Sequence, residues 1–266
     1  MRRITTVSSS NNIKNEIVNI LNSADDELSE RYTIPLINLT KEFEINILKK
    51  VLLEILEDEN IPKETMLAYN AFYTLTICTR RYRNLIEMKE YIDKYSGYFQ
   101  QKASYNAIMC IYLTRLAENK KDYELFRQAL EYAQKASDLM PNNIGVIHLF
   151  PDVVANCYLQ GFEFDEDIFN KAIMLVKKCI ILNSEFSTYY YTFGRLLMIE
   201  NNYDEAEDNI KLAIQYENAT DSSGLLRVSE YNIILLKIEN QRLMQKSKDY
   251  FNLQIEETNK WRGAGI

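Results

Sequence analysis

One histidine and four cysteines are the residues of this chain best suited to catalysis or metal binding. His148 follows the apolar residues Val146 and Ile147 near a predicted helix start, so histidine-based acid–base or triad chemistry would rest on it alone. A histidine in that setting is more typical of a core-edge or capping residue. The cysteines are widely spaced, each lies in an apolar helical run, and none forms a CxxC pair: Cys78, Cys110, Cys157 and Cys179. We therefore predict buried thiols in a reducing compartment rather than a zinc site.

Carboxylates are plentiful, but they fall in turns or on solvent faces, as in Asp204-Glu205 and Glu207-Asp208. Proton transfer needs a carboxyl group whose pKa is shifted by a cleft, and this pattern indicates surface charge instead. The seven glycines are scattered, so neither GxGxxG nor GxxxxGK[ST] can be written from them. We predict a protein that is not an enzyme and has no cofactor and no metal. An enzyme with an unfamiliar site is the less favoured alternative.

Composition and charge narrow the class of protein further. A net charge of −7 argues against broad nucleic-acid binding, which depends on neutralising phosphates. Seven glycines and four prolines are few for a β-rich chain of 266 residues, so long helices with short connections are favoured. There is no apolar run of about 18 residues, and MRRITTVSSSNN has no apolar segment after its arginines. We therefore expect no membrane span, no secretory signal and a cytoplasmic protein.

The first 62 residues show no repeat. Residues 1–11 are polar and are predicted to form a flexible leader. Residues 12–62 are predicted to form an N-terminal helical cap, with apolar residues at helical spacing from Ile13 to Leu21 and again from Phe43 to Leu56. Between them, the acidic stretch DDELSERYTIP is predicted to be irregular and broken by Pro35.

Repetition begins near residue 63 and continues to about 223. The triplet Tyr69-Asn70-Ala71 recurs 36 residues later as Tyr105-Asn106-Ala107. A second unit, 110–143, ends with Pro141, which fits the slot that stops a helix. In the third unit Pro151 is predicted to interrupt the first helix, and five extra residues, Gly161–Asp165, lie between the two helices. A period in the mid-thirties with two helices per period indicates a helical solenoid.

The fourth unit, 187–220, has the clearest pattern of residue sizes. Counted from Ser187, positions 4, 7, 8, 11, 20, 24 and 27 are occupied by Tyr190, Phe193, Gly194, Leu197, Ala206, Ile210 and Ala213. Small residues stand where two helices would touch, and bulky residues stand where a core needs filling. This pattern resembles the tetratricopeptide-repeat (TPR) family over about residues 66–220. The resemblance implies an all-α, right-handed TPR-like solenoid of antiparallel helix pairs. The first unit departs from it, because Leu85, Lys89 and Ile92 replace the small, bulky and small residues of its second helix.

In TPR proteins the first helices of successive repeats line a groove that binds peptides or partner proteins. Carried over by position, this implies that the groove residues are Thr114, Glu118, Asp152, Asn156, Tyr191 and Arg195. Among them Asn156 suits a peptide amide, Arg195 suits a carboxylate, and Tyr191 suits an aromatic anchor. The alternative is that Asn156 and Arg195 are solvated groove residues that contact no ligand.

Residues 224–262 are predicted to form one long helix. Its first half should cover the end of the array, and its polar second half should project as an arm that allows homo-oligomerisation. The resulting hypothesis is a non-enzymatic scaffold that binds a protein or peptide. The alternative is a regulatory or sensor module of a bacterial signalling or defence system, although the first 60 residues contain no basic recognition helix.

Overall fold

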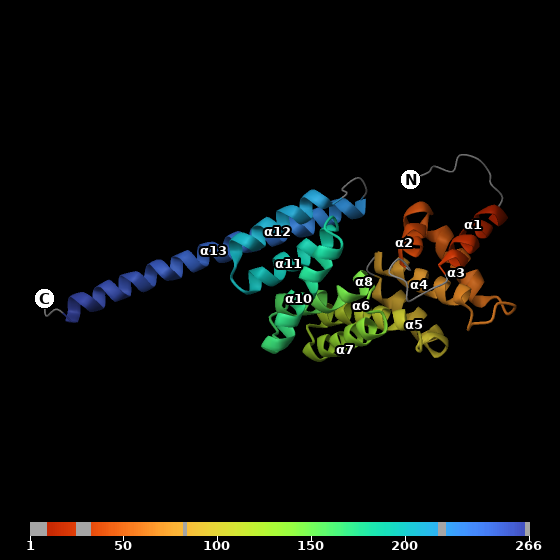
Figure 1. Ribbon diagram of the computed structural model, residues 1–266, viewed down its shortest axis with the longest axis horizontal. Helices are drawn as coiled ribbons and strands as arrows, with labels where there is room; N and C mark the ends of the chain where they lie inside the picture. Colours follow the sequence, from red (N-terminus) through yellow and green to blue (C-terminus); the bar gives the residue numbers. More distant parts are fainter. Residues whose placement is uncertain (1–9, 25–32, 82–83, 218–221, 264–266) are drawn as a thin grey trace. The chain divides into compact units, whose positions relative to one another are not determined.

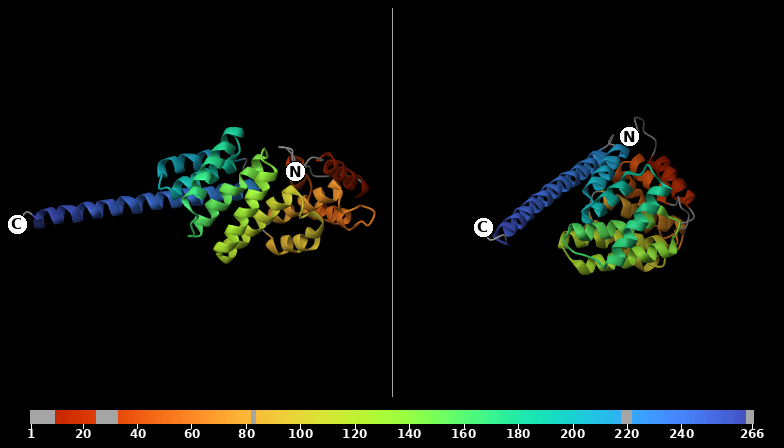
Figure 2. Two further views of the ribbon diagram at one scale, coloured as in Figure 1. Left: turned by 60° about the horizontal axis from the view of Figure 1, so that its bottom comes forward. Right: turned by 60° about the vertical axis from the view of Figure 1, so that its left-hand side comes forward.

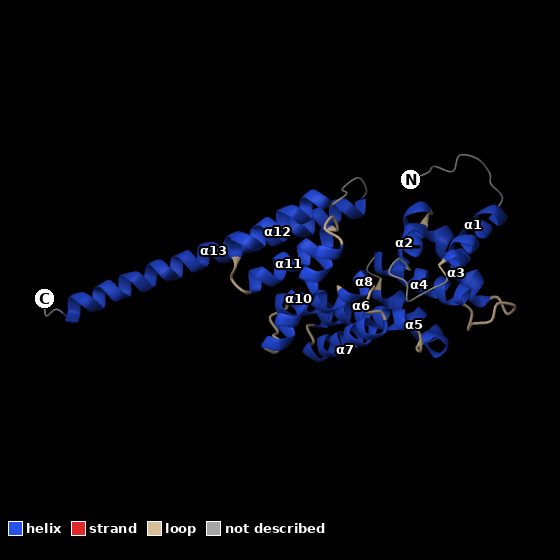
Figure 3. Ribbon diagram, in the orientation of Figure 1, coloured by secondary structure: helices blue, strands red, loops and turns tan. Residues whose placement is uncertain are grey.

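The computed structural model describes residues 10–24, 33–81, 84–217 and 222–263, and every regular element within them is a helix (Figures 1 and 3). The prediction of an all-α fold is therefore confirmed. The chain divides into two compact units, residues 1–169 and 170–266, and each is described by itself. Most of the predicted leader, residues 1–9, lies outside the described residues. Residues 10 and 11 already belong to the first helix.

The first unit begins with three helices, α1 (Ser10–Ser23), α2 (Thr33–Glu42) and α3 (Ile45–Glu57). They contact one another, and each of them also contacts α4 (Met66–Arg81). Most of the stretch DDELSERYTIP, predicted to be irregular and broken by Pro35, lies outside the described residues, but its last three residues form the start of α2, so the prediction is wrong there. Pro35 is the third residue of α2, and at that position a helix needs no backbone N–H donor, so the proline is tolerated.

The repeats begin at α4, and the remaining helices of the first unit continue them. These helices are α5 (Leu85–Phe99), α6 (Ala103–Lys120), α7 (Tyr123–Leu139), α8 (Ile144–Ile147) and α9 (Leu149–Leu159). The helices α6 and α7 pack as a hairpin, and Ala117, Ala129 and Ala133 are fully buried, as the small-residue pattern predicts. The helix α7 ends two residues before Pro141.

Aromatic rings separate α4 from α5 in the first repeat. Phe72 of α4 stacks on Phe99 of α5 with ring centroids 5.0 Å apart, and Tyr69 lies 5.3 Å from the same ring. Tyr95 meets Phe72 edge-on at 6.1 Å. These rings explain how two helices can pack although the small residues of the repeat pattern are missing from α5.

The third repeat differs from its neighbours at two places. Pro151 was predicted to interrupt the first helix of this repeat, and that helix is interrupted within one turn before the proline, at His148 between α8 and α9. Pro151 itself lies in the first turn of α9. The extra residues Gly161–Asp165 follow α9, where Gly161 has a φ of +85°. Phe164 of this segment is buried, and the ring of Phe162 lies 5.8 Å from that of Tyr123. The insertion is therefore a packed segment of the first unit.

The helix α10 (Glu166–Leu182) contains the boundary between the two units, and α11 (Ser187–Ile199), α12 (Tyr203–Tyr216) and α13 (Ser222–Gly263) follow. The helices α11 and α12 form a hairpin that α13 contacts (Figure 2). At their contact, a Cβ added to Gly194 would lie 2.7 Å from Ile210 Cδ1 and 3.0 Å from the carbonyl oxygen of Ala206. Glycine is required because the two backbones approach so closely. The helix α13 continues well past α12 (Figure 1).

Candidate partner-binding site

Tyr191 and Arg195 lie one turn apart on α11, on the side of the helix next to its contact with α12. The face that packs on α12 includes Gly194, so the i,i+4 pair is held in a fixed orientation. The guanidinium carbon of Arg195 lies 4.5 Å from the centre of the Tyr191 ring. This is a cation–π contact between two of the six residues predicted to bind a partner.

Tyr231 of α13 completes this arrangement. Its ring centre lies 4.5 Å from that of Tyr191, with the two planes inclined by 34°. Tyr231 is 1% exposed, whereas Tyr191 is only half-buried. We call the three side chains Arg195, Tyr191 and Tyr231 the aromatic stack. Tyr191 therefore has a fixed ring position before any partner arrives.

Tyr231 was not among the site residues predicted from the sequence. Its spacing with Ile234 and Ile238 predicts a packing position, and all three are buried. A tyrosine in an apolar stripe needs a hydrogen-bond partner for its hydroxyl, and that requirement was the available signal. The hydroxyl donates to the carboxylate of Glu217 over 3.1 Å.

Glu217, the residue after α12, holds the start of α13 in place. Its carboxylate also accepts hydrogen bonds from Ser187 Oγ at 2.7 Å and from the Arg227 guanidinium at 2.8 Å. Burial alone would raise the pKa of this carboxyl, but the Arg227 and Ser187 hydrogen bonds outweigh burial and lower it. Burial raises the pKa of the Tyr231 hydroxyl to about 12, so this group stays a neutral donor.

Arg195 is 2% exposed, which differs from a solvated groove residue. Its guanidinium donates to Thr192 Oγ1 at 3.2 Å in addition to covering the Tyr191 ring. In this arrangement Arg195 supports Tyr191 from within the protein. Its contact with a ligand carboxylate stays a prediction.

Two of the predicted residues in the first unit share a narrow crease between α6 and α9. Thr114 and Asp152 line it together with Arg115, and its volume is about 10 Å³. That volume admits about one water molecule and excludes a peptide side chain. The Thr114 hydroxyl donates to the carbonyl oxygen of Cys110 at 2.8 Å, a contact within its own helix.

Glu118 and Asn156 lie one turn further along the same two helices. Glu118 accepts two hydrogen bonds from Arg115 Nη1, at 2.8 and 3.0 Å, so its charge is already paired. Asn156 is 7% exposed. The structure thus brings Thr114 and Asp152 together in the first unit and Tyr191 and Arg195 together in the second.

Comparison with solved structures identifies the fold that carries these residues. TTC0263, a thermophilic TPR protein of Thermus thermophilus, matches 85% of this chain and 100% of its own, with a TM-score of 0.50 and 15% identity. The chain has the fold of a tetratricopeptide-repeat protein. YrrB, a TPR protein with an unusual peptide-binding site, covers 84% of the chain and 98% of its own at a TM-score of 0.43 and 17% identity.

A third TPR structure, the TPR2AB domain of yeast Sti1 in its pHSP90 complex, covers 86% of the chain and 99% of its own at a TM-score of 0.35 and 11% identity. No protein-family model and no curated protein matches the chain. At these identities the likeness concerns the TPR fold alone.

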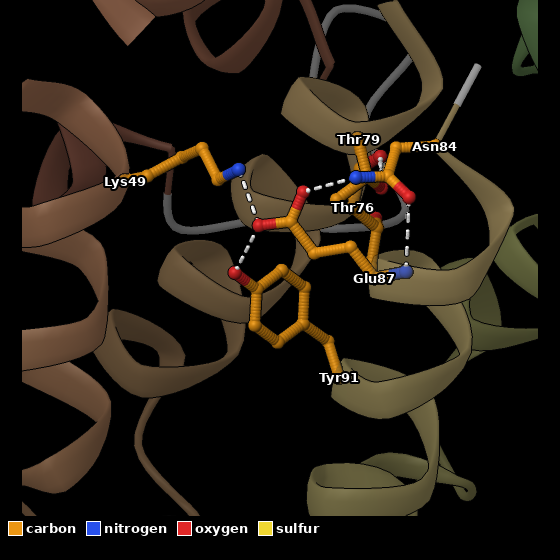
Figure 4. Close-up of polar contacts among 6 residues, drawn as sticks. All are labelled: Lys49, Thr76, Thr79, Asn84, Glu87 and Tyr91. Atoms are coloured by element: carbon orange, nitrogen blue, oxygen red, sulfur yellow. Dashed lines mark hydrogen bonds and ion pairs between the residues drawn. The ribbon is translucent and has the colours of Figure 1, made fainter. Parts of the chain in front are cut away.

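A hollow of about 420 Å³ lies between α3 and α5, beside the first repeat. It is lined by Lys49, Lys50, Glu54, Glu57, Glu87 and Tyr91 among others. Figure 4 shows its polar centre, the Glu87 carboxylate. It is bound by Lys49 Nζ, by the Tyr91 hydroxyl at 2.6 Å and by the Asn84 amide at 3.0 Å.

The Glu87 cluster is better suited to holding helices together than to chemistry. Burial would raise the pKa of Glu87, but hydrogen bonds from Lys49 and Tyr91 outweigh it and lower the pKa. Burial, helped by the hydrogen bond to Glu87, raises the pKa of Tyr91. The carboxylate therefore stays charged and the phenol stays neutral near neutral pH, so neither is poised for proton transfer. The cluster joins α3 to α5 and thereby docks the N-terminal helices.

The residues first considered for chemistry lie in the core of the TPR fold. His148 is 7% exposed at the junction of α8 and α9, as expected for a core-edge residue, and all four cysteines are buried thiols. Within the described residues, no group of three or more histidine, cysteine or carboxylate side chains is arranged to hold a metal ion. No helix in the described part of the chain has the length and apolar character needed to cross a bilayer.

Proposed function

We propose that the protein is a non-enzymatic scaffold that binds a partner protein or peptide at the face of α11, with Tyr191 as the anchor. The observation that carries this proposal is the aromatic stack. A half-buried tyrosine ring held between a guanidinium and a second ring loses little entropy on binding. Tyrosine is also enriched among the residues that dominate binding energy at interfaces.

The partner would be an extended peptide or a helix that lies along α11. Tyr191 would contribute apolar contact through its ring and a hydrogen bond through its hydroxyl, with Arg195 fixing the ring from behind. Asn156, Asp152, Thr114 and Glu118 are proposed as contacts in the first unit. Because Glu118 is paired with Arg115, it would hold that guanidinium at the crease rather than bind a cation directly.

A random-peptide display library selected on the full chain tests this proposal. The strongest binder would be titrated by calorimetry against wild type and the variants Tyr191→Ala and Tyr191→Phe. We expect the alanine variant to weaken binding by about 30-fold, a typical loss at an interfacial anchor. The phenylalanine variant should retain most of the affinity, because it keeps the ring.

The matched control is Tyr98→Ala, since Tyr98 is 54% exposed on α5 and lies outside the proposed surface. Circular dichroism of each variant would show that the fold is retained. Absence of any enriched peptide would contradict the proposal, as would equal affinities for wild type and Tyr191→Ala.

A further inference from the structure

The helix α13 has two apolar faces, and only one of them is covered. Tyr231, Ile234 and Ile238 are buried, and α13 contacts α12 and α11. At about 100° per residue, the opposite side of the helix carries a second apolar row. We call it the outer stripe, and it consists of Leu226, Ile233, Leu236, Leu243 and Tyr250, which are 53–64% exposed.

The second half of α13 lacks support from the rest of the described chain. Every residue from Leu243 to Glu256 is exposed, including the large side chains of Met244, Phe251 and Leu253. An isolated helix is marginally stable in water, because most helical stability in proteins comes from packing of an apolar face. A long helix with exposed leucines and aromatics therefore requires a partner surface.

The spacing of the outer stripe identifies the shape of that surface. One column of residues recurs every seven positions and consists of Leu226, Ile233, Asn240 and Ser247. A second column lies three residues after the last three of these and consists of Leu236, Leu243 and Tyr250. Two columns offset by three residues in a seven-residue repeat form the seam of a coiled coil. The first column also carries two polar residues, Asn240 and Ser247, and a polar residue at such a position is the feature that fixes register in such pairs. The outer stripe therefore fits another helix.

Charges beside the outer stripe favour a second copy of the same helix. Glu239 and Lys246 are exposed and occupy the same position of consecutive repeats, one residue before the first column. In antiparallel pairing these positions face one another across the seam. Glu239 would then face Lys246 of the second copy, and Lys246 would face its Glu239. Parallel pairing would instead place Met244 and Phe251 opposite these charges.

We propose that the protein forms an antiparallel dimer through the outer stripe of α13, with its twofold axis near residue 242. In this register Asn240 faces Leu243 of the second copy and Ile233 faces its Tyr250. The helix α12 covers the opposite side of α13 and holds it through Arg242, whose guanidinium lies 2.7 Å from the Glu207 carboxylate. A second copy can thus reach the stripe without displacing α12. This proposal is independent of peptide binding at Tyr191.

Sedimentation velocity of the full chain from about 1 to 100 μM tests the dimer. We expect wild type to sediment as a dimer at the upper end of that range and Leu236→Glu/Leu243→Glu as a monomer with unchanged helix content. The matched control is Ile181→Glu, an 82% exposed aliphatic residue of α10, which should remain dimeric. A monomeric wild type would overturn the proposal, since the stripe would then serve a different protein, and so would an unaffected double variant.

Charge reversal tests the antiparallel orientation. Glu239→Lys and Lys246→Glu should each weaken self-association about tenfold, because two attractive pairs become two repulsive pairs. An equimolar mixture of the two variants should restore the dimer. In the mixed pair the lysine introduced at position 239 faces the glutamate introduced at position 246, and the native Lys246 faces the native Glu239. Variants that dimerise as tightly as wild type would overturn the antiparallel arrangement, as would a mixture that associates no better than its components.

Discussion

The hydroxyl of Tyr231 and the carboxylate of Glu217 lie 3.1 Å apart, and this hydrogen bond joins the N-terminal part of α13 to the residue that follows α12. The same tyrosine ring contacts Tyr191 at 4.5 Å. A carboxylate that stabilises the capping helix therefore also positions the residue proposed to bind a partner. Stability of α13 and affinity at Tyr191 should respond together when this pair is disturbed.

Glu217→Gln should destabilise the protein at neutral pH by about 1–3 kcal/mol, because a charged acceptor with three donors is lost. The pKa of Glu217 is lowered in the folded state, so the folded protein binds fewer protons than the unfolded chain between the two pKa values. Its contribution is complete above the ordinary carboxyl pKa of about 4.3 and disappears as the pH falls through the folded value. Urea denaturation of both proteins from acid to neutral pH measures this.

The exposed Glu185 in the connection before α11 provides the control for that titration. Glu185→Gln should leave the free energy of unfolding at neutral pH close to that of wild type, because this side chain is exposed. A constant difference between wild type and Glu217→Gln from acid to neutral pH would contradict the assigned role of the charge.

Two glycines in helices should respond in opposite directions to alanine. Gly194→Ala should cost about 1–3 kcal/mol, because the new methyl group collides with Ile210 and the Ala206 carbonyl. Gly97→Ala should stabilise by about 0.5–1 kcal/mol, since nothing lies within 4 Å of a Cβ at that position of α5 and alanine favours the helix. Thermal denaturation of each single variant measures the two effects. Stabilisation by Gly194→Ala would show that the helices are not in close contact there.

The thiols of Cys157 and Cys179 should be unreactive in the folded protein. Burial raises the pKa of each to about 12, so their thiolate fraction at pH 8 falls by about three orders of magnitude relative to an ordinary cysteine. Reaction with Ellman's reagent should be slow in buffer and should reach all four cysteines only in guanidinium. A rapid stoichiometric phase in buffer, mapped by mass spectrometry to either residue, is the result that would refute this.

Asn70 should determine how firmly α1 is attached. Its amide nitrogen donates to the carbonyl oxygens of Leu21 at 2.8 Å and Ala24 at 2.6 Å, at the end of α1. Asn70→Asp replaces the donor with an acceptor and should cost about 1–3 kcal/mol, with faster amide hydrogen exchange in α1. Asn46→Asp, at an exposed position of α3, should leave that exchange unchanged. Equal protection of α1 in all three proteins would assign its attachment to other contacts.

The repeat fold was predictable where two helices approach closely, because the small residues that such a contact requires can be read directly from the sequence. Gly194, Ala206 and Ala213 allow this close approach. The helix α2 was missed because its weak periodicity is supported by contact with α4, a tertiary effect that spacing does not report. The packing of α4 on α5 was also unclear from the sequence, because large rings there replace small residues.

The candidate site was predictable only in part. Position within a repeat led to Tyr191 and Arg195, and the structure places them in contact. Burial depends on elements distant in sequence, so Arg195 was expected to be solvated and Tyr231 was not expected at the site. For the same reason, spacing did not show that the crease beside Thr114 and Asp152 admits about one water molecule.

The packed segment after α9 has a consequence for engineering by module exchange. Consensus repeats of one length can be added, removed or reordered, because each contacts only its neighbours through equivalent surfaces. Here the turn at Gly161 directs Phe162 toward Tyr123 and allows Phe164 to be buried, so the added length supplies part of the hydrophobic core. Shortening this segment to the standard length would remove the part of the hydrophobic core that it supplies. The third repeat is therefore not an exchangeable module, and a redesigned array would have to keep it together with the start of α7.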